Sequence, residues 1–207
     1  TESSIQTPSI SVTNAPAPVN TPEVSATNTP MQILPASSTF AVHFLDVGQA
    51  DAALVLCDNR AMLIDGGNGE DSSLIYSYLK KLNITQLDYM VCTHAHEDHV
   101  GGLAGALNYA TVGTAFCPVT SYDSDAFRNF TKYLDNQGVS ITIPSPGDSF
   151  TLGSATVTVL GPINPSDEQN NTSIVLRIIY GDTSFLFAGD AQREEELDIL
   201  DAGYTLA

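Results

Sequence analysis

The sequence predicts an α/β sandwich of mixed β-sheets, and the order of its elements supports this prediction. From residue 39 onward, short apolar runs typical of strands alternate with segments of helical apolar spacing. Several of the strands follow one another directly, as in hairpins, and others are separated by a helix. This mixture favours a layered sandwich with mixed sheets over an all-parallel, doubly wound sheet.

Apolar runs bounded by turn residues predict the strands. The expected strands cover residues 40–45, 52–57, 61–64, 87–92, 112–117 and 139–143, followed by hairpins over 150–160 and 174–187. Asp58-Asn59, Gly153 and Gly181-Asp182 lie at the expected hairpin turns. These residue types favour tight turns because they tolerate a positive φ or bond their own backbone.

Apolar residues at helical spacing predict the helices between the strands. The expected helices cover residues 74–82, a short segment after Gly101-Gly102, 125–137 and 192–200. Asp71 or Ser72 is the expected N-cap of the first helix. Gly138 and Gly203 are expected to end the last two, since glycine adopts the left-handed conformation of a helix C-terminus at little cost.

Residues 1–38 differ in composition from the rest of the chain. They are rich in Ser, Thr, Pro, Asn and Ala, and they contain six of the 11 prolines. Such a segment buries too little apolar surface to offset its ordering entropy. We therefore expect a disordered stalk or linker over 1–38 and one folded domain over 39–207. A stalk of this kind would tether an exported domain, whereas a plain disordered tail would say nothing about location.

Composition restricts the partners. The chain carries 24 acidic and 7 basic residues, for a net charge of −17. It should therefore not bind duplex DNA stably on its own. No apolar run approaches the roughly 20 residues of a membrane-spanning helix. The three cysteines show no CxxC spacing and are expected in the core, without a disulfide framework. Nothing in the sequence defines an oligomeric state.

The segment Thr93–His99 carries the chemistry. It contains three of the four histidines, with Asp98 among them, directly after a buried strand. His94 and His96 alternate, so an extended backbone can point them to the same side. Asp98 and His99 should then lie across the following turn. This spacing suits two neighbouring metals, for which imidazole and carboxylate ligands favour Zn²⁺, with Mn²⁺ or Fe as alternatives.

Four segments together resemble a known family. His94-x-His96-x-Asp98-His99 resembles the metal signature of the metallo-β-lactamase superfamily, and segments 43–52, 63–67 and 184–190 add to the match. They are similar to the branch that contains the extracytoplasmic domain of the competence protein ComEC and the phosphorylcholine esterases. The resemblance begins at Phe40 and implies a four-layer αββα sandwich. Isolated in its strand, His43 is expected to be a packed or edge histidine.

The resemblance also implies a set of metal ligands. His94 and His96 match the ligands of one metal, Asp98 and His99 match those of a second metal, and Asp190 matches the carboxylate that bridges the two. Zn²⁺ is the expected cofactor, at two sites in the complete fold. Asp98 would also be the catalytic residue, since its carboxylate could orient the attacking hydroxide.

Other residues of the motifs are expected to support the ligands. Asp65 matches the aspartate that orients the metal motif through hydrogen bonds, and Asp46 and Asp51, in the glycine-glutamine motif of the branch, are expected to act similarly. For all three, turn chemistry is an equally weighted alternative. The superfamily often supplies a third histidine to the first metal where this chain has Asn170-Asn171-Thr172-Ser173. Asn171 or Ser173 is therefore a candidate on the substrate side.

The resemblance also implies a further ligand near the C-terminus. The family's last metal histidine lies on a strand after the helix that follows Asp190, and this chain stops at Ala207. We therefore expect the fold to be truncated there, with a second metal bound weakly.

The expected function is that of a metal-dependent hydrolase using a metal-activated hydroxide. Its resemblance points to phosphodiester bonds, in nucleic acid or in a phosphorylated cell-wall polymer. The alternatives are hydrolysis of a carboxylic ester, thioester or lactam, or a non-catalytic stalked surface domain with a structural metal. The expected location is extracellular or tethered to a bacterial cell surface.

Overall fold

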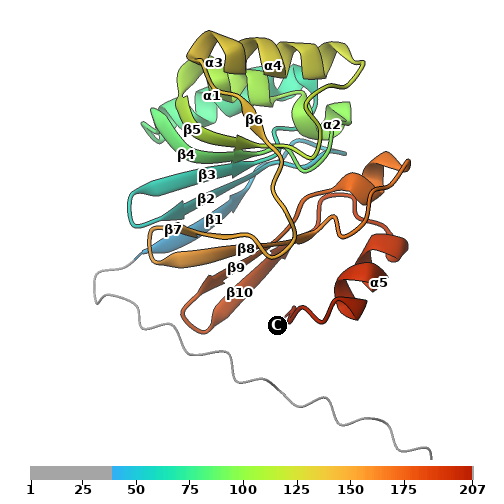
Figure 1. Cartoon of the computed structure of the whole chain (residues 1–207). Helices are drawn as coiled ribbons and strands as arrows, with labels where there is room; N and C mark the ends of the chain where they lie inside the picture. Colours follow the sequence, from blue (N-terminus) through green and yellow to red (C-terminus); the bar gives the residue numbers. More distant parts are fainter. Residues whose placement is uncertain (1–38, 207) are drawn as a thin grey trace, which may run out of the picture. The chain divides into compact units, whose positions relative to one another are not determined.

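The computed structural model describes residues 39–206. The predicted stalk over 1–38 lies outside the described residues. Two β-sheets pack face to face, and helices cover the outer face of each sheet (Figure 1). The domain is therefore an α/β sandwich, as the element order predicts, with the four αββα layers that the resemblance implies.

The first sheet is mixed. Its six strands, in spatial order, are β1 (Phe40–Phe44), β2 (Ala53–Cys57), β3 (Arg60–Ile64), β4 (Gln86–Val91), β5 (Thr111–Phe116) and β6 (Ile141–Thr142). The first three strands pair antiparallel, and β3 to β6 pair parallel. Parallel neighbours bring the carboxyl ends of β3 and β4 to one edge, where the polar segments that follow them meet.

The second sheet is antiparallel throughout. Its spatial order is β10 (Thr183–Phe187), β9 (Val175–Tyr180), β8 (Ala155–Gly161) and β7 (Ser149–Leu152). The turns of its hairpins contain Gly153 and Gly181, both at φ 58°. Asp58 and Asn59, between β2 and β3, have φ of 49° and 65°, which fits a two-residue hairpin turn. All three predicted hairpin turns are confirmed.

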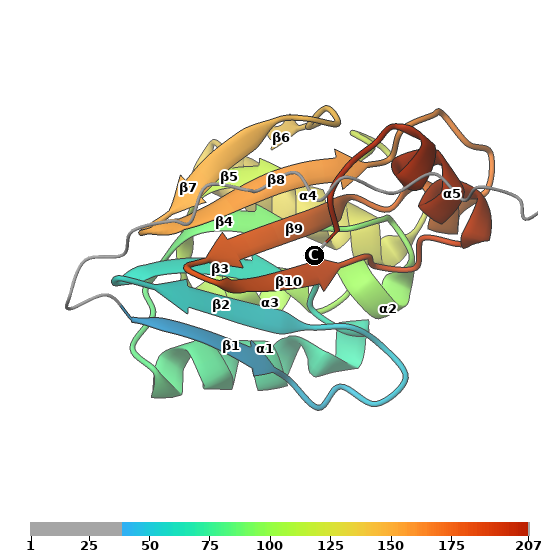
Figure 2. The same ribbon diagram turned by 90° about the horizontal axis from the view of Figure 1, so that it is seen from below.

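Helices enclose the sandwich on both sides. Helices α1 (Ser72–Lys81), α3 (Leu103–Tyr109) and α4 (Asp125–Gln137) cover the first sheet, and α5 (Arg193–Asp201) packs on the second (Figures 1 and 2). Short helical segments occur at η1 (Gly69–Asp71), α2 (Glu97–Val100) and η2 (Gln169–Thr172). Gly138 ends α4 with φ 69°, as predicted. None of the helices in residues 39–206 combines the length and apolar character of a bilayer crossing.

Two large apolar clusters hold the layers together. One lies between the first sheet and its helices and includes Leu103, Phe127 and Phe130. The other lies between the sheets and includes Val157 and Ile178. The three cysteines are buried and free, as expected of core residues.

Local details add to or correct the predictions. Asp71 is the N-cap residue of α1, one of the two predicted positions, although its carboxylate accepts from the backbone N–H of Asn68 at 2.8 Å and makes no hydrogen bond to α1. The strand expected over 139–143 is shorter because the N–H of Val139 bonds the Leu134 carbonyl at the end of α4. Helix α2 was not predicted, since four residues are too few for helical periodicity to show.

Candidate metal centre

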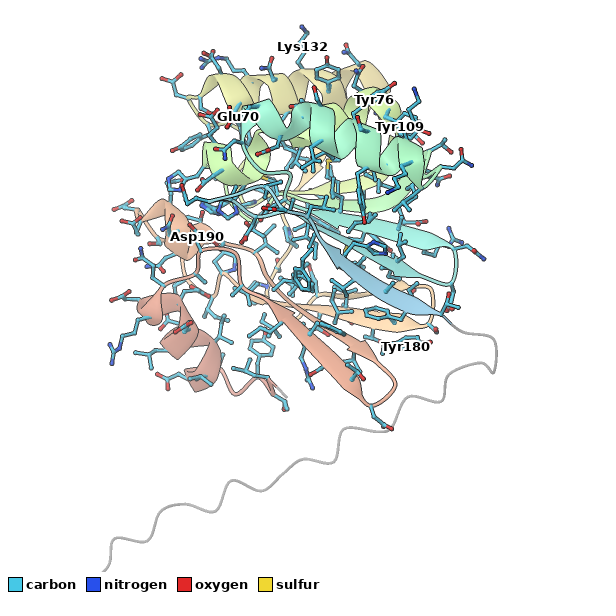
Figure 3. All side chains as sticks on the ribbon, turned by 180° about the vertical axis from the view of Figure 1, so that it is seen from behind. Glu70, Tyr76, Tyr109, Lys132, Tyr180 and Asp190 are labelled. Carbon is cyan, nitrogen blue, oxygen red and sulfur yellow. The ribbon has the colours of Figure 1, made fainter. Side chains whose placement is uncertain are left out.

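The predicted ligands meet at one end of the sandwich. Thr93–His99 follow β4, and Asp65 directly follows β3 at the same edge of the first sheet. Asp190 lies in the segment between β10 and α5, at the corresponding end of the second sheet (Figure 3). Ligands from the two halves of the chain thus come together across the sandwich.

His94 and His96 form a pair with their ring nitrogens turned toward each other. Nε2 of His94 lies 3.0 Å from Nδ1 of His96. The His94 ring is buried, whereas His96 is partly exposed at the N-cap of α2. The alternation of the two histidines along extended backbone therefore places them as the spacing predicts.

Asp98 and His99 lie in α2 rather than across a turn. The short helix begins after His96, whose carbonyl accepts the N–H of His99 at 3.2 Å. Helical winding turns His99 into the protein, so that its side chain is only 2% exposed, while Asp98 remains 25% exposed. The Oδ1 atom of Asp98 lies 4.0 Å from Nε2 of His99.

The Asp190 carboxylate lies near Nε2 of both His94 and His99, whose ring centroids are 4.1 Å apart. Its Oδ1 is 3.3 Å from Nε2 of His99, and its Oδ2 is 3.9 Å from Nε2 of His94. One carboxylate oxygen therefore faces each ring. These distances allow the carboxylate to be shared by two metals, and they also allow one metal to be held by all three side chains.

Asp65 is a buried acceptor that orients His99. Its side chain is 1% exposed, and its oxygens accept from the backbone N–H of Thr93 at 2.8 Å, the Thr93 hydroxyl at 2.7 Å and Nδ1 of His99 at 2.9 Å. A proton held on Nδ1 directs Nε2 of His99 toward Asp190. Of the two hypotheses for Asp65, ligand orientation is therefore supported by direct contacts.

Thr93 and Ser173 support His94 in the same way, and neither role was predicted. The Thr93 hydroxyl gives its proton to Asp65, so its oxygen, 3.3 Å from Nδ1 of His94, can accept there. The Ser173 hydroxyl lies 3.5 Å from the same Nδ1 and accepts the backbone N–H of Asp190 at 3.2 Å. The Thr93 contact favours a proton on Nδ1 of His94, which leaves Nε2 free as a ligand.

The structure does not place Asn171 and Ser173 on the substrate side. Asn171 is 8% exposed, and Ser173 is fully buried. Oδ1 of Asn171 accepts the backbone N–H of Gln192, just before α5, at 2.9 Å. Both side chains are therefore used internally, one to hold the start of α5 and the other to hold His94.

Asp46 and Asp51 differ in their relation to the centre. The exposed Asp46 accepts the backbone N–H of Gly48 at 3.4 Å, a local turn contact. A carboxylate oxygen of Asp51 lies within 4.8 Å of ligand atoms of Asp65 and His99. Turn chemistry therefore describes Asp46, and Asp51 belongs to the environment of the centre. His43 packs between β1 and α1, with Nδ1 2.7 Å from the Tyr78 hydroxyl, as expected of a packed histidine.

The surroundings shift the pKa values of the two buried histidines in opposite directions. Burial and the neighbouring His99 and His96 together lower the pKa of His94 to about 3, although Asp98 opposes this. Burial also lowers the pKa of His99, but the hydrogen bond and charge of Asp65, with Asp190 and Asp98, outweigh this and raise it to about 9. His94 is therefore neutral at pH 7, while His99 in the metal-free chain must release a proton to become a ligand.

The donor set fits a divalent cation. Nitrogens of His94 and His99 and an oxygen of Asp190 lie within 4.8 Å of one another. Burial raises the pKa of Asp51, and although His99 opposes this, the nearby Asp65, Asp190 and Asp98 carboxylates add to it. A cation relieves such crowding of carboxylates. Buried imidazoles and converging carboxylates in an αββα sandwich define a metallohydrolase-type domain.

Comparison with known proteins agrees with this class. The Metallo-beta-lactamase superfamily pattern matches residues 45–206, so the chain belongs to that superfamily. Two curated relatives are each 26% identical over 183 residues. They are ComE operon protein 3 of Bacillus subtilis, aligned over 79% of this chain, and Recombination protein 2 of Haemophilus influenzae, aligned over 80%. The chain spans only 24% and 21% of their lengths.

Solved structures share the fold. Metallo-β-lactamase SMB-1, bound to 2-mercaptoethanesulfonate, aligns with a TM-score of 0.53 at 16% identity, over 78% of this chain and 70% of that one. MEM-A1, a subclass B3 metallo-β-lactamase from a soil metagenome library, aligns with a TM-score of 0.51 at 18% identity, over 70% and 58%. At these identities the likeness concerns the fold alone.

Proposed function

We propose that this domain is a metallohydrolase that cleaves phosphodiester bonds, in nucleic acid or in a phosphorylated cell-wall polymer. The observation that carries the proposal is the place of Asp190, with one oxygen toward His94 and the other toward His99. A carboxylate shared in this way suits a two-metal centre, and such centres commonly serve in-line displacement at phosphorus. ComEC-like relatives support the choice, since one is named for recombination, a process on nucleic acid.

Each ligand has a role in this proposal. His94 and His96 would hold one cation, Asp98 and His99 the other, and Asp190 both. Divalent cations bound there would lower the pKa of water and stabilise charge on a phosphoryl oxygen. The carboxylates of Asp98 and Asp190 are 25% and 38% exposed, so substrate and water can reach the side of the centre on which they lie.

The other residues of the site prepare this arrangement. Asp98 would accept a hydrogen bond from the attacking water and orient it toward phosphorus. Asp65 and Thr93 hold the backs of the imidazoles, so their Nε2 atoms need little reorganisation on binding. His94 and His99 are almost fully buried, which excludes bulk water from that side of the centre.

Charge limits the kind of substrate that the domain can take. The net charge of −17 and the carboxylates at the site repel an anion until cations are bound. We therefore propose capture of a single phosphoester group at the metals, without stable duplex binding by this chain. We further propose that the domain acts outside a bacterial cell, tethered through the proline-rich segment 1–38.

Hydrolysis assays distinguish this proposal from its alternatives. The Zn²⁺- or Mn²⁺-loaded chain would be incubated with bis(p-nitrophenyl) phosphate, and in parallel with a chromogenic cephalosporin, an aryl ester and a thioester. We expect turnover of the phosphodiester, abolished in Asp190→Asn and unchanged in Glu194→Gln. The control removes the same charge from an exposed position in the first turn of α5.

Each of the other outcomes has a defined meaning. Preferred turnover of the cephalosporin, ester or thioester would replace the phosphodiester assignment with the corresponding one. Metal binding without turnover of any of these substrates would favour a structural metal in a surface domain. Equal phosphodiester turnover in wild type and Asp190→Asn would contradict the proposed role of Asp190.

A further inference from the structure

We propose that Gln49 is a positioning residue that sets which oxygen of Asp98 faces the metal centre. The inference rests on the proposed metal centre and concerns a residue to which the motifs assign no role. Nε2 of Gln49 donates to Oδ2 of Asp98 at 3.0 Å. The other oxygen, Oδ1, is the one that lies 4.0 Å from Nε2 of His99. The two oxygens of the Asp98 carboxylate thus have different partners, since Oδ2 accepts from the Gln49 amide and Oδ1 faces His99.

The loop that carries Gln49 is held against α2 by its backbone. The N–H of Asp51 donates to the carbonyl of Asp98 at 3.2 Å, and the carbonyl of Asp51 accepts the N–H of Gly67 at 2.8 Å. At the base of the loop, the N–H of Leu45 donates to the carbonyl of Ala52 at 2.9 Å. These backbone hydrogen bonds fix the distance between the loop and α2. The Gln49 side chain therefore has the length needed for its amide to contact Asp98.

Asp98 needs such a contact because its own helix restrains it weakly. It lies in the four-residue α2 and is partly exposed, so its carboxylate would otherwise sample several rotamers. Ordering a flexible side chain costs free energy, and a contact made before the metal arrives reduces the cost of binding. A donor to Oδ2 also leaves the lone pairs of Oδ1 available to a cation.

The chemistry of the amide suits this position. Gln49 donates a hydrogen bond without carrying a charge. A lysine or arginine there would repel the cation, and a glutamate would add an anion beside Asp98 and remove the donor. A neutral donor of this length is therefore the side chain that orients Asp98 without competing for the metal.

Metal titration tests the role of Gln49 without requiring catalysis. The full chain would be titrated with Co²⁺ and followed by its visible absorption, in wild type, Gln49→Ala, Gln49→Glu and Gln86→Ala. Gln86 is an exposed glutamine at the start of β4, the strand whose opposite end precedes the metal motif, and it serves as the control. The thermal midpoint of each metal-free chain would be measured in parallel.

We expect Gln49→Ala to bind Co²⁺ about 10- to 100-fold more weakly, as is typical when a residue that orients a ligand is removed. The metal-free midpoints should match that of Gln86→Ala. Gln49→Glu separates positioning from charge. Added negative charge alone would tighten Co²⁺ binding, whereas loss of the donor predicts weaker binding, as in Gln49→Ala.

Three results would overturn the proposal. These are equal Co²⁺ affinity in wild type and Gln49→Ala, tighter binding in Gln49→Glu, or weaker binding accompanied by a lower metal-free midpoint, which would assign Gln49 a structural role. Failure of the wild-type chain to bind Co²⁺ at all would overturn the metal centre itself. These two failures can be told apart, because a centre that does not depend on Gln49 would still bind Co²⁺ in the wild-type chain and in Gln49→Ala.

Discussion

Replacing Asp65 with asparagine should weaken metal binding while the fold persists. Asp65 has φ 57°, a left-handed conformation that asparagine tolerates better than alanine does, so Asp65→Asn changes chemistry more than backbone. The amide oxygen can still accept the N–H of Thr93. The amide nitrogen, however, would face the Thr93 hydroxyl and Nδ1 of His99, where the carboxylate accepted both hydrogen bonds.

The cost can be worked from these contacts. The substitution removes two hydrogen bonds to a charged acceptor, and we take about 1.5 kcal/mol for each. This value is near the lower end for such bonds, because the variant is also relieved of the cost of burying a charged carboxylate. The free energy of unfolding should therefore fall by about 3 kcal/mol. For a domain of this size, that corresponds to a thermal midpoint lower by roughly 6–12 °C. A donor opposite Nδ1 also favours the His99 tautomer that carries its proton on Nε2, the atom that faces Asp190.

The assay combines denaturation with Zn²⁺ titration. Asp65→Asn should bind Zn²⁺ at least about 10- to 100-fold more weakly than wild type. Asp46→Asn removes an exposed carboxylate whose contact is local, and it should change stability by less than about 0.5 kcal/mol. Wild-type Zn²⁺ affinity and an unchanged midpoint in Asp65→Asn would refute the reasoning that Asp65 orients His99.

Three further predictions concern stability and metal content. Urea denaturation of the metal-free chain should show greatest stability near pH 6.5. Below pH 6.5 the free energy of unfolding should fall, because His94 takes up a proton in the unfolded chain but not in the folded one, where its pKa is about 3. Above pH 6.5 it should also fall, because the folded chain, in which the pKa of His99 is about 9, then gradually loses the proton that stabilises it. A free energy of unfolding that rises steadily from pH 6.5 to 9 would contradict this. His96→Ala and Asp190→Ala should each lower bound zinc by elemental analysis while circular dichroism stays unchanged, and wild-type zinc content in both would refute their assignment. Deleting residues 1–38 should leave the thermal midpoint within about 4 °C, and a larger loss would indicate that they contribute about 1 kcal/mol or more.

Local chemistry explains why much of the fold could be predicted. Hairpin turns at Asp58-Asn59 and the end of α4 at Gly138 depend on backbone conformations that few residue types favour. His94 and His96 are two positions apart on extended backbone, so their proximity follows from strand geometry. Each of these features is encoded within a few residues.

Contacts between distant segments explain why the rest could not be predicted. Gln49 meets Asp98 across 49 positions, and Ser173 meets His94 across 79, so both pairs depend on how the loops and the two sheets pack. Thr93 lies within the metal motif, but its hydrogen bond to Asp65, which lets its oxygen accept from His94, depends on how β3 and β4 pair in the fold. The resemblance pointed to the region of Ser173, whereas its burial behind His94 required the structure.

The most direct test of the account is the location of bound metal. A crystal of the chain grown with Zn²⁺ would be measured on both sides of the zinc absorption edge, and the anomalous difference map would locate the ion. The account predicts a peak within coordination distance of Nε2 of His94 and Nδ1 of His96, or of Nε2 of His99, with Asp190 among the ligands. A map with no peak among these side chains, from crystals that hold zinc elsewhere, would contradict it.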